Sequence, residues 1–235
     1  MAAPGAAPVR VERVLDTAAD LLVRWGYQRV TIDEIARRAG IGKGTVYLHF
    51  RTKEELFLMV LLRTHHRVAA AMVDRMLADP AEVLPARMVR SLFLDIAADP
   101  VTRPLYLGDP EVLGRLAHEA AETLAGLGER RDAVLREHLG LLREAGLLHT
   151  DRTVDEQHYL LSAIGSGFYF VDGMGLPYAP ADVHGRAALL EHALAAALHA
   201  PDPPAGPSAA LARQVADRYR SLIGHIDDEW RARVR

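Results

Sequence analysis

Cysteine is absent from this chain of 235 residues. Disulfide bonds, thiolate catalysis and cysteine-ligated metal sites are therefore excluded. There is also no uninterrupted run of the roughly 20 apolar residues that a membrane-spanning helix needs, since the most apolar stretch, residues 159–171, is broken by Ser162 and by Gly165-Ser166-Gly167. Residues 1–8 are small and lack the apolar segment of a signal peptide, so we expect a disordered lead-in and a cytoplasmic protein.

An excess of positive charge is missing as well. The chain has 28 basic and 31 acidic residues, a net charge of −3, which argues against a protein that coats nucleic acid everywhere. Any contact with DNA must therefore be local. Residues 1–55 carry nine basic and seven acidic side chains, a net of +2, and they include the two lysines of the chain, Lys43 and Lys53. The occurrence of both lysines in this segment could also be chance, so it does not by itself indicate a DNA contact.

Apolar residues three and four positions apart predict a first helix that Gly26 ends. Thr31 and Glu34 then have the form of a capping box, in which the threonine hydroxyl accepts from the third helical amide and the glutamate reaches back to the cap. We expect a second helix to start there and to end at Gly40, followed after a short turn by a third helix over about residues 43–49. The predicted buried face of the first helix comprises Val11, Val14, Leu15, Ala18, Leu21, Leu22 and Trp25.

Thr52 and Glu55 form a second capping box, which opens a long helix over residues 53–78. Beyond it, helical patterns are separated by glycine and proline breakers and nothing predicts strands, so the fold class is all-α. The segment PDPPAGP at 201–207 is a linker. A final helix within 208–235 has an apolar face that must dock on the preceding helical domain or on a dimer partner: Leu211, Val215, Tyr219, Leu222, Ile226 and Trp230.

The helix pair joined by a short turn is typical of major-groove recognition, because the groove admits one helix and bases are read at short reach. Gly44 allows close approach of the backbone, Thr45 offers a hydroxyl and a methyl group, and Lys43 can donate to guanine or phosphate. The first amides of the helices that begin near Thr31 and Lys53 are natural phosphate contacts.

Residues 31–56, TIDEIARRAGIGKGTVYLHFRTKEEL, resemble the DNA-binding signature of the tetracycline-repressor (TetR) family. With the preceding helix, the resemblance covers roughly the first quarter of the chain. It implies that residues 43–49 form the recognition helix, that Tyr47 and His49 contact phosphates, and that Lys53 lies at the start of the helix linking two domains. Gly42 departs from the serine or threonine cap common in the family, although glycine is tolerated as a cap.

The domains expected on this basis are a helix-turn-helix DNA-binding domain over 9–52 and a helical ligand-sensing and dimerisation domain over 53–200. No part of this second domain aligns with a family signature, so the resemblance transfers the fold but not the ligand. We expect a homodimer that binds double-stranded operator DNA of palindromic sequence and that a small, mainly apolar organic effector releases. Repression rather than activation is implied by the resemblance alone.

Candidates for the effector site are aromatic, histidine and small residues on apolar helix faces. Each has an alternative role, because core packing, backbone hydrogen bonding and helix packing leave the same pattern as a pocket. For the triplet at 165–167 we favour close packing of helices across a two-fold axis. The candidates are His65, Phe93, Tyr106, His138, Ser166 and Tyr169.

Two other functions remain as alternatives. Eleven histidines invite a metal-responsive regulator, but His184, His192 and His199 are spaced eight and seven apart, whereas ligands on one helix prefer three or four; we expect neither a metal nor a cofactor. A helical enzyme lacks motif support, since His118-Glu119 has no second histidine and no glycine-rich phosphate loop follows a strand. A structural DNA-bridging protein would not need so large an apolar second domain.

Overall fold

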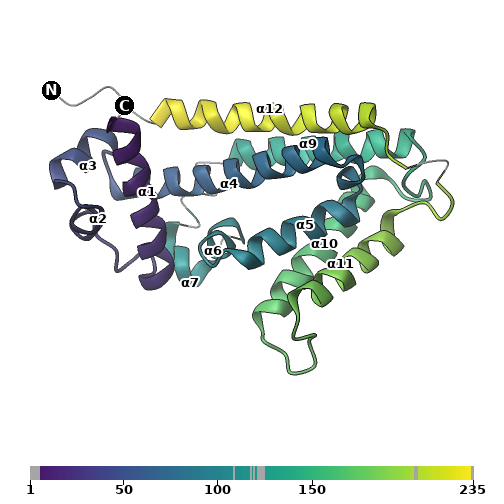
Figure 1. Ribbon diagram of the computed structural model, residues 1–235, viewed down its shortest axis with the longest axis horizontal. Coiled ribbons are helices and arrows are strands. Elements are labelled where there is room, and N and C mark those ends of the chain that lie inside the picture. The colour runs from purple at the N-terminus through teal and green to yellow at the C-terminus, as the bar shows by residue number, and fades with distance from the viewer. Residues whose placement is uncertain are drawn as a thin grey trace. The chain divides into compact units, whose positions relative to one another are not determined.

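A computed structural model describes the chain except for residues 1–5, 108, 117, 119, 121–124, 204–205 and 234–235. Over the described residues the fold is helical without strands, as predicted (Figure 1), and the extended backbone pairs only in an isolated bridge between Leu148 and His199. The helices are α1 (Ala6–Trp25), α2 (Ile32–Ala39), α3 (Lys43–His49), α4 (Lys53–Ala78), η1 (Pro80–Val83), α5 (Pro85–Ala98), α6 (Thr102–Leu107), α7 (Pro110–Leu113), α9 (Ala125–Glu144), α10 (Val154–Gly173), α11 (Val183–Leu198) and α12 (Ala209–Arg233).

The expected lead-in over 1–8 is partly wrong. Residues 1–5 lie outside the described part, but α1 begins at Ala6, so residues 6–8 are helical. Pro8 is compatible with this because a proline in the first turn removes an amide that has no helical partner there.

The contacts divide the chain into two compact units, which do not follow the predicted boundary between residues 52 and 53. Unit 1 contains residues 1–67, 99–127 and 224–235, and unit 2 contains residues 68–98 and 128–223. Local sequence predicts where helices begin and end. The two units depend on packing between distant segments, which local patterns do not predict.

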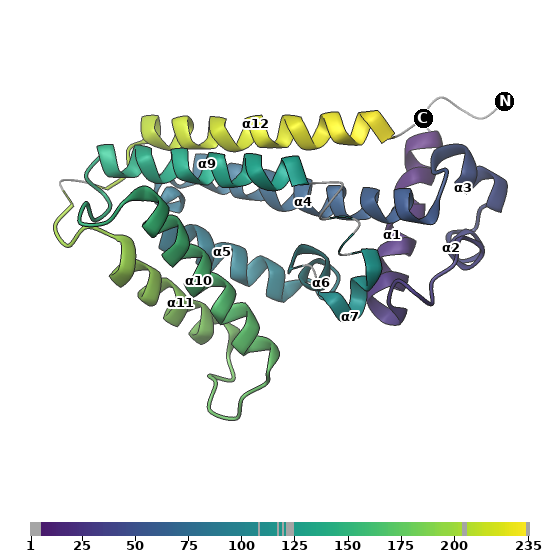
Figure 2. The ribbon, with the colours of Figure 1, turned by 180° about the vertical axis from the view of Figure 1, so that it is seen from behind.

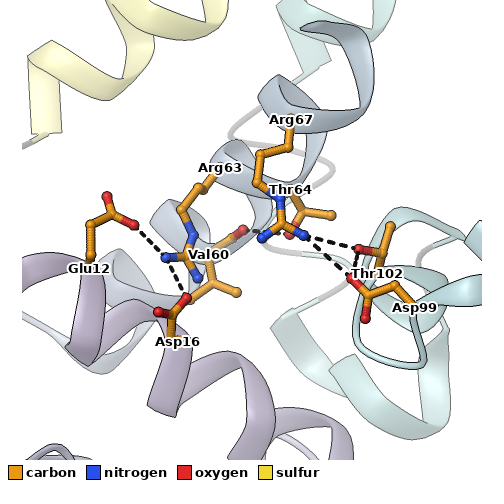
Figure 3. Close-up of polar contacts among 8 residues, drawn as sticks. All are labelled: Glu12, Asp16, Val60, Arg63, Thr64, Arg67, Asp99 and Thr102. Carbon is orange, nitrogen blue, oxygen red and sulfur yellow. Dashed lines mark hydrogen bonds and ion pairs between the residues drawn. The ribbon is translucent and has the colours of Figure 1, made fainter. Parts of the chain in front are cut away.

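Unit 1 contains the helix-turn-helix. The predicted face of α1 is buried at Val14, Leu15, Ala18, Leu21 and Leu22. α1 is also held to α4 through Arg63, whose guanidinium lies 2.7 Å from a carboxylate oxygen of Glu12 and 2.9 Å from one of Asp16 (Figure 3).

The segment that follows α5 also belongs to unit 1. Arg67, one turn after Arg63 on α4, lies 3.4 Å from both Asp99 and the Thr102 hydroxyl at the start of α6 (Figure 3). The amide of Tyr27 donates to the carbonyl oxygen of Val112 in α7 over 2.8 Å. These contacts explain why residues 99–127 group with the N-terminal helices.

Unit 2 is a separate helical core. α10 and α11 lie side by side, and α11 also packs on α5 (Figure 2). On α12, Val215 and Tyr219 of the predicted apolar face are buried in this core together with Ala212 and Ala216. Further along α12, in unit 1, Ile226 is buried and Trp230 is half-buried.

α4 has the length and composition of a membrane-crossing helix, the one such helix in the described part of the chain. However, 67% of its apolar stretch is buried inside the fold. Such burial is typical of the core helix of a folded domain.

Candidate nucleic-acid interface

Local sequence positions α2 and α3 much as predicted. The Thr31 hydroxyl accepts the amide of Glu34 at the start of α2. Gly40 ends α2 with φ of 67°, a left-handed conformation that glycine adopts without strain. α3 begins at Lys43 after the Gly42 cap and buries Val46.

The reciprocal bond of the first capping box is absent, which corrects the prediction. Glu34 does not reach back to Thr31, because Arg37 and Arg38 both donate to its carboxylate from the next turn. These hydrogen bonds, first from Arg37 and then from Arg38, lower the pKa of Glu34 to about 2. Charged donors outcompete the neutral amide for the carboxylate.

The second capping box is also modified. The Thr52 hydroxyl accepts the amide of Glu55 over 3.1 Å, as expected. The Glu55 carboxylate, however, accepts the amide of Arg51 over 2.6 Å rather than that of Thr52. Phe50 is the C-terminal cap of α3. The bond therefore holds Arg51, the next residue, close to the first turn of α4.

The residues on the exposed side of α3 differ in their contacts and exposure. Lys43 is bound to Asp33 over 2.8 Å, a hydrogen bond that raises the pKa of the lysine. Gly44 is open, since a Cβ at this position would meet no atom within 4 Å. Thr45 is half-buried. Tyr47 and Leu48 are the exposed large side chains, at 46% and 70%.

His49 is half-buried at the end of α3, and its ring lies 6.3 Å from that of Phe50 in an edge-on contact. Its neighbour Phe50 is only 1% exposed and anchors the end of the helix. The predicted DNA-contacting residues of α3 therefore share one short helix, but they differ in how far each side chain is exposed.

Lys53 is held inside unit 1 rather than presented as a free cation. Its ammonium group donates to the carbonyl oxygen of Tyr27 and lies 4.1 Å from the centre of the Tyr27 ring. Burial lowers the pKa of this lysine. Tyr27 in turn donates its hydroxyl to Glu54 over 2.7 Å, which lowers the pKa of that carboxyl. No local pattern in the sequence indicates this role for Tyr27.

Two other cations suit phosphate contact better. Arg29, in the turn between α1 and α2, and Arg51, after α3, are exposed and have no acidic side-chain partner for their guanidinium groups within the described part of the chain. The sequence-based prediction included both in the local charge but did not single them out. Their positions, just before α2 and just after α3, could have indicated phosphate contacts from the sequence.

The candidate effector residues fall into separate places. In unit 1, His65 stacks on Tyr106 with ring centres 5.2 Å apart, and its Nδ1 lies 2.9 Å from the Leu61 carbonyl oxygen. In unit 2, Phe93 lies 5.2 Å from Tyr169, ring centre to ring centre.

Ser166 is exposed on α10, in contrast to the buried Gly165, which lies against Val89. It therefore joins neither aromatic pair. Its exposure agrees better with a surface of α10 that packs on another helix than with a pocket wall.

His138 is a buried structural histidine. It is 0% exposed, its Nε2 lies 2.7 Å from the Val83 carbonyl oxygen, and its Nδ1 lies 3.1 Å from the Tyr219 hydroxyl. Burial lowers its pKa to about 4. The neutral ring therefore joins α9, η1 and α12, which assigns it to the core alternative rather than to a ligand.

Neither of the two cavities described in unit 2 is lined by a predicted effector residue. One of about 330 Å³ lies between α9 and α12, with Leu141, Glu144, Leu211 and Gln214 among its lining residues. Among the described residues, no group of three or more histidine, aspartate or glutamate side chains is placed to hold a metal ion.

The N-terminal residues match a known family. Residues 14–60 match the family model described as bacterial regulatory proteins, tetR family. The helix-turn-helix segment of this chain is therefore similar to the DNA-binding part of that family. The HTH-type transcriptional regulator SrpR of Pseudomonas putida is 40% identical over 55 residues, 23% of this chain and 26% of SrpR. The match thus spans about a quarter of the length of SrpR, which is a transcriptional regulator by name.

Solved structures extend the likeness to most of the chain. SmeT, the repressor of the Stenotrophomonas maltophilia multidrug efflux pump SmeDEF, has a TM-score of 0.60 at 23% identity and covers 84% of this chain and 96% of its own. FadR of Bacillus subtilis in complex with stearoyl-CoA has a TM-score of 0.62 at 18% identity and covers 78% and 96%. These likenesses show that this chain shares its helical fold, including the C-terminal part, with both structures.

Proposed function

We propose that this chain is a tetR-family transcriptional repressor that binds a palindromic operator as a homodimer and is released by a small organic effector. The observation that carries the DNA-binding part is α3, a short helix within a helix-turn-helix, with Tyr47 and Leu48 exposed beside the open Gly44. A surface of this kind fits the width of the major groove. A cytoplasmic location follows from this role.

Dimerisation is supported by an uncovered face of α10. Tyr159 and Phe170 are 74% and 71% exposed. They are eleven residues apart, close to three helical turns, so they lie on the same side of the helix. Between them the exposed positions are small: Ser162, Ala163, Ser166 and Gly167.

The order of large and small residues on this face suits a second copy of the chain. The large residues lie at the two ends of this face and the small ones lie between them. In an antiparallel pair related by a two-fold axis, Tyr159 of one copy would therefore lie beside Phe170 of the other. On the adjacent helix α11, Leu189 is a further exposed large apolar side chain, at 51%. Exposed aromatic patches of this extent are typical of interfaces.

The dimer is tested by light scattering at micromolar concentration with and without operator. We expect two chains per particle for the natural sequence and one for Phe170→Glu, with Arg213→Glu on the exposed side of α12 as the matched control. A monomer in both conditions for the natural sequence contradicts the dimer.

The effector is proposed to be a small, mainly apolar organic molecule. FadR of Bacillus subtilis was solved with stearoyl-CoA, and SmeT is the repressor of a multidrug efflux pump, so acyl-CoA thioesters and hydrophobic drugs are the classes to screen first. The aromatic pairs His65 with Tyr106 and Phe93 with Tyr169 are the positions to vary. Release of operator by divalent metal alone, abolished by replacing His65 and His66, would instead support metal sensing.

A further inference from the structure

Leu48 occupies the middle of the outward side of α3. Val46 is 0% exposed and marks the direction of the core. Two residues further along an α-helix, a side chain points about 160° away, and Leu48 is accordingly 70% exposed. Gly44 and Thr45, one turn earlier on the chain, lie to either side of it. Leu48 is therefore the more exposed of the two large side chains, Tyr47 and Leu48, that α3 presents to solvent.

The groups around Leu48 leave it unobstructed. A Cβ at Gly44 would meet no atom of the described residues within 4 Å, so the surface one turn before Leu48, toward which helical side chains lean, is open. The ammonium group of Lys43 is drawn to Asp33 over 2.8 Å. Tyr47, 46% exposed, adds an aromatic ring rather than a second charge. The face consequently offers carbon surface at its centre.

The carbon group that a base pair offers in the major groove is the C5-methyl of thymine. We propose that Leu48 reads a thymine methyl group in each half-site, so that Leu48 is a specificity-determining residue and the facing base pair is A·T. The proposal rests on the proposed function, since it requires α3 to enter the groove. A single exposed leucine is ordinary on a protein surface, but this one stands at the centre of the helix face that reads DNA.

The experiment removes the methyl group from the DNA. Duplexes are selected from a randomised pool with the natural protein, and each thymine of the selected site is then replaced by deoxyuridine, which lacks only the methyl. At the thymine facing Leu48 we expect affinity to fall about fourfold, the value of one buried methyl group. Leu48→Ala should lose a similar factor on the thymine duplex and nothing more on the deoxyuridine duplex.

Leu77→Ala is the matched control, because it truncates a leucine that is 38% exposed on α4, outside the helix-turn-helix. It should retain the full sensitivity to deoxyuridine. If Leu48→Ala retains that sensitivity too, or if the natural protein is indifferent to deoxyuridine at every position, the assignment of Leu48 is wrong. If no sequence is enriched from the pool, the proposed function itself fails, which is a different result from failure of the methyl contact.

Discussion

The ammonium group of Lys53 lies 4.1 Å from the centre of the Tyr27 ring and donates to the carbonyl oxygen of the same residue. This pairing ties the start of α4 to the turn after α1. Lys53→Met, which keeps the length of the stem but removes the charge, should therefore lower the free energy of unfolding by about 1–2 kcal/mol. Urea denaturation measures this loss.

The same variant distinguishes support from phosphate contact. Because Lys53 is engaged within unit 1, the salt dependence of DNA binding should stay as in the natural protein. A slope reduced by about one, with stability unchanged, would show that Lys53 releases Tyr27 and binds phosphate instead.

Arg51 should behave in the opposite way. Its side chain is exposed and has no acidic partner in the described part of the chain, so Arg51→Ala should weaken binding to operator and to random DNA alike and should lower the salt slope by about one. Affinity is measured over a series of salt concentrations, with Arg213→Ala as the control for loss of an exposed arginine elsewhere. A loss confined to the operator would mean that Arg51 contacts a base.

Thr45 is the complementary position. Its half-buried side chain lies on the outward face of α3 beside Leu48, so Thr45→Ala should change which base is preferred at one position of each half-site and leave affinity for random DNA unchanged. Selection from a randomised pool with the variant shows the change directly. Equal losses on operator and random DNA would assign Thr45 to phosphate contact.

Local patterns predicted the elements better than their partners. The long helix opened by Thr52 was expected over residues 53–78, and α4 spans Lys53–Ala78, because a capping threonine and a following proline mark helix ends within a few residues. The same patterns did not predict the partner of Glu34, since two arginines one turn away compete for it. Nor did they predict that Asp33 binds Lys43, ten residues along the chain.

The DNA-binding segment could be predicted from sequence better than the effector site, for a related reason. The helix-turn-helix is contiguous in sequence, so helical periodicity could predict which of its residues face outward. The effector candidates are scattered over residues 65–169, and whether they meet depends on tertiary packing. His138 was expected on an apolar helix face, and it is buried there. Its contact with Tyr219, 81 residues away, follows from the docking of α12 and could not be predicted locally.

Arg63 is expected to support the orientation of α1 on α4. Its guanidinium is largely buried, at 13% exposure, and is shared by Glu12 and Asp16. Arg63→Ala should cost about 1 kcal/mol, because it removes two ion pairs whose carboxylates, 55% and 67% exposed, remain hydrated without their cation. Glu12→Gln should cost less, since Asp16 remains. Thermal denaturation compares the two, and equal losses would contradict the shared arrangement.

His138 should make stability depend on pH. Burial holds its folded pKa near 4, below the ordinary value of 6.5, so the unfolded chain binds a proton more readily. Stability is therefore complete above about pH 6.5 and declines as the pH falls toward 4, by up to about 3 kcal/mol. Unfolding measured from pH 7 to pH 4 tests this, and His138→Gln should show a correspondingly flatter profile if the histidine is responsible.

The most direct test of the account is a titration of the natural protein with a selected two-fold symmetric duplex and with a scrambled duplex of the same composition, at one salt concentration. We predict that the selected duplex binds at least about a thousandfold more tightly, with a saturation ratio of two chains per duplex. Equal affinities for the two duplexes, or saturation at a single chain, would contradict a dimeric, sequence-specific regulator.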